Sequence, residues 1–167
     1  MATRNELHDM VIESLTEALL QLMKKKPLAQ ITVSELCKKA GVSRISFYRN
    51  FESMQDILIQ YLTACTDEWW AEFSTRPESE LFDSFWAELL VQYRRHSELI
   101  HLIYDNQVSY VMKEHIFSCC GLKQEPPAED CYARAVLAGA VYGMVDQWIR
   151  LGMKEIPEDF SISQYIH

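Results

Sequence analysis

Two short helical segments joined by a turn constrain the fold of this chain more than any other feature. Thr32 followed three residues later by Glu35 is the pattern of a capping box, which predicts that a helix starts here. Gly41 lies where a helix commonly ends in a left-handed residue. Ser43 is a favourable N-cap for a second helix at 44–50. The pattern therefore predicts a helix-turn-helix.

The outward face expected for the second helix carries groups that bind nucleic acid. Cys37, Val42 and Phe47 are placed to pack the two helices against each other. The outward positions hold cations, hydroxyls and an amide, which suit phosphates and base edges in a major groove. They are Arg44, Ile45, Ser46, Tyr48, Arg49 and Asn50. Thr32 and Ser43 add helix N-termini, which attract phosphate. A helical hairpin inside a larger bundle has the same spacing and is the alternative.

Apolar residues recur at helical spacing along the rest of the chain, and no segment alternates with period two. Pro77 and the pair Pro126-Pro127 mark breaks between helices. We predict an all-α protein, with an N-terminal three-helix domain over residues 1–52 and a helical bundle over residues 53–167. The further helices are expected at 7–26, 53–73, 79–95, 97–104, 106–119 and 129–152, with a weaker one near Pro157.

Charge is divided unevenly along the chain, although the formal net charge is −8. Residues 1–50 carry eight Lys and Arg against five Asp and Glu, a net charge of +3. The remaining residues carry eight positive and nineteen negative side chains, a net charge of −11. The first part contains the predicted helix-turn-helix, and it is the part that can approach phosphates.

Residues 31–51, ITVSELCKKAGVSRISFYRNF, resemble the DNA-binding signature of the TetR family of bacterial transcriptional regulators, and the similarity extends over about residues 7–60. It implies a regulator, expected to be a repressor, that binds an inverted-repeat operator as a homodimer. It also implies that the second domain dimerises and binds a small-molecule effector that releases the DNA. By position, the resemblance implies that Thr32, Tyr48 and Asn50 contact the DNA backbone, while Arg44, Ile45 and Ser46 face bases.

Two positions depart from the family pattern. Asn50 stands where the family commonly has histidine, and Met54 stands where it commonly has lysine. Asn50 can still donate a hydrogen bond to phosphate, but Met54 cannot, and Glu52 adds a negative charge nearby. We expect weak operator affinity or an operator that compensates. The alternative function is a TetR-like interaction module, or co-regulator, that acts through a partner protein.

Aromatic side chains are concentrated in the second part of the chain. The candidate ligand contacts among them are Trp69, Phe73, Trp86, Tyr93, Tyr104, Tyr142 and Trp148. Aromatic residues at helical spacing usually fill a core, which is the alternative for each of them. TetR-like proteins often enclose an apolar cavity here, so the resemblance implies a small apolar or aromatic effector. The excess of acid would suit a cationic ligand, but we favour an acidic surface that keeps this part away from DNA.

The long helix expected at 129–152 is rich in small residues. Gly139 and Gly143 would let a partner helix come close, and the broad apolar side of this helix fits a core or an interface. The dimer interpretation gains weight because a dimer reads two half-sites, whereas a single helix-turn-helix offers little specificity.

Motifs of other function classes are missing. There is no phosphate loop, no G-x-S-x-G and no H-E-x-x-H. The single Glu98-x-x-His101 spacing is half of what a di-iron bundle needs, and His115 has no plausible ligand neighbour in sequence. The cysteines lack C-x-x-C spacing and are interpreted as free thiols, with oxidant sensing by Cys119-Cys120 as a less favoured alternative. We expect no enzyme activity, metal or cofactor, no membrane span or signal peptide, and a cytoplasmic location.

Overall fold

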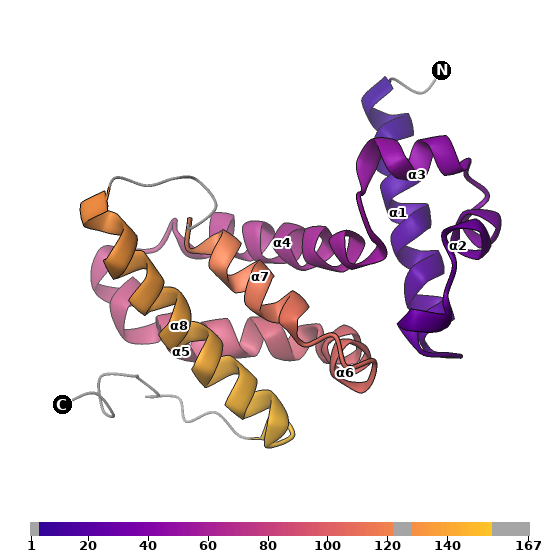
Figure 1. Ribbon diagram of the computed structural model, residues 1–167. Coiled ribbons are helices and arrows are strands. Elements are labelled where there is room, and N and C mark those ends of the chain that lie inside the picture. Colours follow the sequence, from indigo (N-terminus) through magenta and orange to yellow (C-terminus); the bar gives the residue numbers. More distant parts are fainter. Residues whose placement is uncertain (1–3, 122–127, 155–167) are drawn as a thin grey trace. The chain divides into compact units, whose positions relative to one another are not determined.

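The computed structural model describes residues 4–121 and 128–154. All regular structure in these residues is helical, which confirms the predicted all-α fold (Figure 1). The elements are α1 (Arg4–Met23), the 3-10 turn η1 (Leu28–Gln30), α2 (Val33–Ala40), α3 (Arg44–Asn50), α4 (Met54–Phe73), α5 (Glu78–Arg95), α6 (Ser97–Asp105), α7 (Tyr110–Cys119) and α8 (Ala128–Arg150). The weaker helix predicted near Pro157 and the break at Pro126-Pro127 lie outside the described residues.

The chain packs as two compact units. The first unit comprises the residues up to Leu62 together with His101–Val111. The second unit comprises Thr63–Ile100 and the residues from Met112 onward. Helices α4 and α6 each contribute residues to both units.

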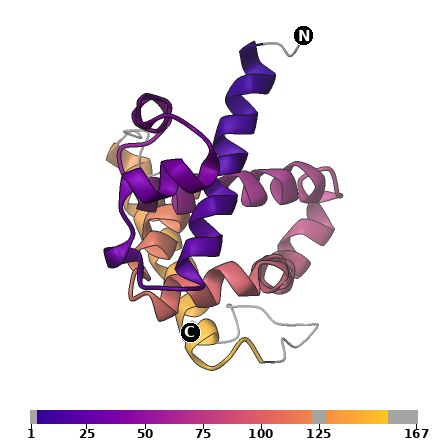
Figure 2. The same cartoon turned by 90° about the vertical axis from the view of Figure 1, so that its right-hand side faces the viewer.

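A core of apolar side chains holds α1, α2 and α3 together in the first unit. Its fully buried members include Leu15, Leu19, Leu36 and Phe47, and each such burial stabilises the fold by roughly 1.5–3 kcal/mol. The N-terminal turns of α1 extend beyond α3 (Figure 2), and Leu7 and Met10 are exposed there. α1 ends at Met23, before the predicted end at Lys26, because the three lysines form a turn.

The end of α6 corrects one predicted boundary. The sequence pattern predicts a helix over 106–119, but α7 begins only at Tyr110. Gln107 has a φ of 59°, in the left-handed region. The N–H groups of Gln107 and Val108 donate to the carbonyls of Tyr104 and Ile103 at 3.0 and 3.1 Å. This pairing is a Schellman ending, for which glycine is the usual residue, so a glutamine there gives no signal in the sequence.

Asn106, the residue before that turn, joins two distant segments of the first unit. Its Oδ1 accepts a hydrogen bond of 2.6 Å from the backbone N–H of Leu28, which lies 78 positions earlier. Its Nδ2 donates to the carbonyl of Leu102 at 2.8 Å, which orients the amide. Leu28 begins η1 and its side chain is buried. The segment between α1 and α2 is therefore held by both a buried side chain and a hydrogen bond from far along the chain.

The second unit has a core of its own. Leu89 and Leu90 of α5 and Met112 and Ile116 of α7 are buried in it. α8 contributes Ala138, Val141, Val145 and Ile149, which recur every three or four residues and so share one helix face. The opposite face of α8 is exposed, with Val136 at 73% of its surface.

Candidate DNA interface and ligand cavity

The start of α2 is capped as the sequence predicts, although only one half of the capping box forms. Thr32 Oγ1 accepts a hydrogen bond from the Glu35 N–H at 3.2 Å. The Glu35 carboxylate binds Lys26 Nζ at 2.5 Å, rather than the backbone of Thr32. This hydrogen bond lowers the pKa of Glu35. Lys26 thus fixes the entry to α2 and leaves the Thr32 backbone N–H without the carboxylate that a full capping box supplies.

The turn between α2 and α3 depends on Gly41. Its φ of 69° and ψ of 24° are left-handed, and the Val42 N–H donates to the Cys37 carbonyl at 3.0 Å. A Cβ on Gly41 would meet no atom within 4 Å, so glycine is needed here for its backbone conformation and not for space. Cys37 is buried at the contact between the helices, and burial raises the pKa of its thiol.

Helix α3 has one buried face and one exposed face. Ser43 caps it, because Ser43 Oγ accepts from the Ser46 N–H at 3.0 Å. Phe47 is fully buried, with its ring centroid 6.0 Å from that of Phe51. The predicted outward residues Arg44, Ile45, Tyr48 and Arg49 are exposed, while Ser46 and Asn50 are half-buried. Ile45 exposes 65% of its surface, so its side chain is accessible for apolar contact, for example with a thymine methyl group.

Polar groups at the end of α3 and the start of α4 are paired within the chain. Asn50 Nδ2 donates to the Ser46 carbonyl at 2.7 Å, which commits one of its amide hydrogens. At the start of α4, Asp56 Oδ2 accepts from the N–H groups of Glu52 and Ser53 at 2.9 and 2.8 Å. The half-buried Met54 lies within this cap. The Asp56 carboxylate thus occupies the first free amides at the N-terminus of α4.

The family model described as "Bacterial regulatory proteins, tetR family" matches residues 15–61, from the second half of α1 into α4. The N-terminal part of the chain therefore has the DNA-binding domain of the TetR family. The chain is also similar to the crystal structure of Lin0861 from Listeria innocua, with a TM-score of 0.70 over 95% of this chain and 88% of that chain. The two sequences are 13% identical, so this likeness shows the fold alone. No curated protein sequence matches the chain significantly.

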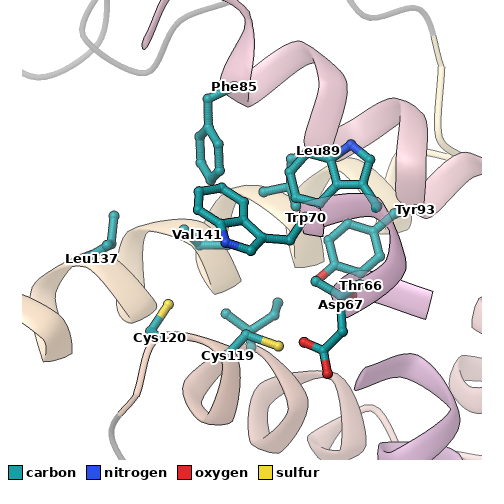
Figure 3. A pocket seen from close by; sticks show the side chains of 12 residues that line it. Thr66, Asp67, Trp70, Phe85, Leu89, Tyr93, Cys119, Cys120, Leu137 and Val141 are labelled. Atoms are coloured by element: carbon teal, nitrogen blue, oxygen red, sulfur yellow. The ribbon is translucent and has the colours of Figure 1, made fainter. Parts of the chain in front are cut away.

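The second unit contains a cavity of about 250 Å³ (Figure 3). α5 lines it with Phe85, Leu89 and Tyr93, which are spaced four residues apart on one helix face. α4 adds aromatic side chains, including Trp69, and the other side is lined by Cys119 of α7, the following Cys120, and Leu137 and Val141 of α8. The helical spacing on α5 is a signal from which sequence reasoning could have selected Phe85.

Of the seven aromatic residues predicted to contact a ligand, Trp69 and Tyr93 line this cavity. Phe73 is buried and stacks on Trp69, with ring centroids 5.0 Å apart. Trp86 packs edge-on against Phe85 at 5.1 Å. Tyr104 belongs to the first unit, and Tyr142 and Trp148 lie on α8 outside the lining. The Trp148 ring instead lies under the Arg94 guanidinium and donates to the Lys154 carbonyl.

Sequence reasoning missed a polar cluster around His115, which is fully buried in the second unit. Its Nε2 lies 3.1 Å from both Thr66 Oγ1 and Tyr93 Oη, and its Nδ1 lies 3.2 Å from Thr63 Oγ1. Cys119 Sγ is 3.6 Å from Nδ1. Burial lowers the pKa of His115 to about 4, so the ring is neutral at physiological pH. The cluster ties α4, α5 and α7 together beside the cavity, because Thr66, Tyr93 and Cys119 also line it.

The two cysteines beside the cavity are held in the thiol form, although Cys119 is exposed. Burial, and then the charge of Asp67, raises the pKa of Cys119 to about 12, and burial also raises the pKa of Cys120. Both groups are therefore thiols at neutral pH, whereas oxidation proceeds through the thiolate. Within the described residues, no three His, Cys, Asp or Glu side chains are grouped to hold a metal ion. None of the helices that the structure describes is long and apolar enough to span a membrane.

Proposed function

We propose that this TetR-family DNA-binding regulator acts as a homodimeric repressor that places one α3 helix per half-site into the major groove of an inverted-repeat operator. The exposed face of α3 carries this proposal, because the capped helix presents Arg44, Ile45 and Tyr48 together above a rigid buried Phe47. Arg44, Ile45 and Ser46 read bases, whereas Thr32, Tyr48, Arg49 and Asn50 contact the DNA backbone. The exposed Lys38 and Lys39 in the last turn of α2 add attraction for phosphate.

Homodimer formation through α8 is supported by the exposed face of this helix. Tyr132, Val136, Gly139 and Gly143 follow one another at helical spacing, and all of them are exposed. A Cβ on Gly139 or Gly143 would meet no atom of the same chain within 4 Å, so packing within the monomer gives no reason for these glycines. Close approach of a second helix gives one, and two copies of α8 bury this apolar face against each other.

Release of DNA by an effector is supported by the cavity in the second unit. Residues of α4 line the cavity, and the first part of the same helix belongs to the first unit with α3. An effector that binds better to the conformation that does not fit the operator shifts the population towards it. The repressor proposal therefore includes effector binding to the second unit and release of operator by the same ligand.

Substitutions on α3 test the proposed operator contacts. Arg44→Ala is expected to relax the preference at one base position by about 5- to 150-fold, because it removes a bidentate base contact. Tyr48→Ala is expected to weaken binding to all duplexes by a similar factor, because it removes a backbone contact. Sites are selected from a random duplex library and titrated by fluorescence anisotropy at several salt concentrations, where log affinity should fall with log salt by about 0.9 per phosphate contact.

The matched control is Arg95→Ala, which removes an exposed arginine from α5 in the second unit. It should leave both the affinity and the selected sequence unchanged. If Arg44→Ala and Tyr48→Ala bind like the parent, α3 is not the recognition helix.

A partner-dependent co-regulator is the second candidate function. It is favoured by the cap at the start of α4, where the Asp56 carboxylate accepts from the Glu52 and Ser53 amides. A folded, dimeric parent that enriches no duplex in the library would support this candidate over the operator-binding repressor.

A further inference from the structure

We propose that the cavity of the second unit binds a small organic cation with an aromatic or alkyl body, such as an aryl quaternary ammonium ion. This inference rests on the proposed effector function and specifies the chemical class of the effector. Three features of the cavity lead to it: its volume, its aromatic walls and the sign of the charge at its edge.

The volume sets the size of the ligand. The cavity measures about 250 Å³, and an apolar cavity of about 150 Å³ is known to accept benzene. A molecule of one ring with a compact substituent therefore fills the space. Larger ligands would require the surrounding helices to move.

The walls provide aromatic faces from two helices. Trp70 of α4 exposes 49% of its surface although it lies against Phe73 and Phe85, with ring centroids 5.9 and 6.4 Å away. Tyr93 and Phe85 of α5 border the same space (Figure 3). A ligand in the cavity would cover the exposed part of the Trp70 ring. Aromatic faces around one site are the arrangement that recognises quaternary ammonium groups, because the ring quadrupole attracts a cation.

The charge at the edge of the cavity indicates whether the ligand is a cation, an anion or a neutral molecule. Among the described residues that line the cavity, Asp67 is the one acidic side chain, and none is a Lys, Arg or His. Figure 3 shows its carboxylate at the edge of the cavity beside Cys119, and its charge contributes to the raised pKa of that thiol. An anion would meet this carboxylate with no cation to compensate for lost water. A cation would gain both the carboxylate and the aromatic walls.

The test compares ligands of one shape and different charge on the full chain. Phenyltrimethylammonium and tert-butylbenzene are nearly isosteric and differ by one positive charge, and benzoate supplies the anion. Their dissociation constants are measured by quenching of tryptophan fluorescence and by calorimetry. The cation is expected to bind about 3- to 30-fold more tightly than the neutral isostere, which is the range for a partly exposed cation–π and carboxylate site. Benzoate is expected to bind most weakly.

Two variants locate the preference in the cavity. Asp67→Asn keeps the size of the side chain and is expected to reduce the ratio between cation and isostere, and Trp70→Leu is expected to reduce it too. Glu68→Gln makes the same change of charge at the next, equally exposed position, which does not line this cavity. It should leave the ratio as in the parent. Circular dichroism of each variant establishes that it is folded.

Three results would overturn the inference. The first is equal or tighter binding of the neutral isostere or benzoate to the folded parent, and the second is the absence of binding by all three probes. The third is an equal fall in the ratio for Glu68→Gln and for Asp67→Asn. The preference for the cation would then come from general surface charge and not from the cavity. The same preparations are assayed on the selected operator. Operator binding without a preference for the cation contradicts this inference alone, whereas cation binding without operator binding contradicts the proposed repressor function alone.

Discussion

Val136→Glu is expected to turn the proposed homodimer into a monomer and to weaken operator binding by about 10²- to 10⁴-fold. Val136 lies at the centre of the exposed apolar face of α8, between Tyr132 and Gly139. In the proposed dimer it faces its own copy, so the substitution places two carboxylates against each other in an apolar contact. Each separated monomer then holds one half-site without the gain from bivalent binding, which typically amounts to this factor.

Sedimentation velocity measures the oligomeric state of this variant, and fluorescence anisotropy on the selected operator measures its affinity. Val136 exposes 73% of its surface in the monomer, so the fold should tolerate glutamate there. Val91→Glu on α5 is the matched control, because it makes the same change at another exposed valine and should leave the dimer intact. A dimeric Val136→Glu variant, or a monomeric Val91→Glu variant, would place the interface elsewhere.

The second large effect concerns acid stability and follows from the burial of His115. The pKa of this ring is about 4 in the folded chain, against about 6.5 when the ring is exposed by unfolding. Between these values the unfolded chain binds more protons, so acid favours unfolding. The contribution of His115 is fully present above pH 6.5 and is lost as the pH falls towards 4. The free energy of unfolding should decrease by about 3 kcal/mol over this window.

Urea unfolding of the parent and of His115→Gln is measured between pH 7.5 and 4. The carboxylates titrate in both proteins, so the difference between the two pH dependences gives the contribution of His115. The variant should be less stable than the parent at pH 7.5, because it disrupts the hydrogen bonds with Thr63, Thr66 and Tyr93. Its stability should decline less steeply with acid, because glutamine does not titrate. Equal slopes for the two proteins would mean that His115 takes up protons in the folded chain as readily as in the unfolded chain.

Local signals explain why the helix-turn-helix could be predicted. The caps at Thr32 and Ser43 and the left-handed Gly41 depend on atoms within five residues along the chain. The residue types at these positions therefore indicate where each helix begins and ends. The ending of α6 obeys the same hydrogen-bonding rules, but Gln107 fills the left-handed position there, and the predicted boundary of the next helix was wrong for that reason.

Contacts between distant residues explain what the sequence left open. His115 meets Thr63 and Thr66 from 52 and 49 positions away, and no periodicity links a buried histidine to partners on another helix. The aromatic residues of the second part pose the same difficulty. Helical spacing indicates which side chains share a face, but the packing of four helices decides whether that face borders the cavity, as for Trp69, or the core, as for Phe73.

The hydrogen bond from Leu28 to Asn106 limits where the chain can be divided to make a chimera. The unit that contains α3 is discontinuous in the sequence, because His101–Val111 pack with the N-terminal helices and Asn106 accepts a hydrogen bond from Leu28. A chimera that joins residues 1–62 to the effector part of another regulator would lack Asn106 and would leave the Leu28 amide without this acceptor. The proposed operator specificity is therefore best transplanted through the exposed residues of α3, with the rest of the first unit left in place.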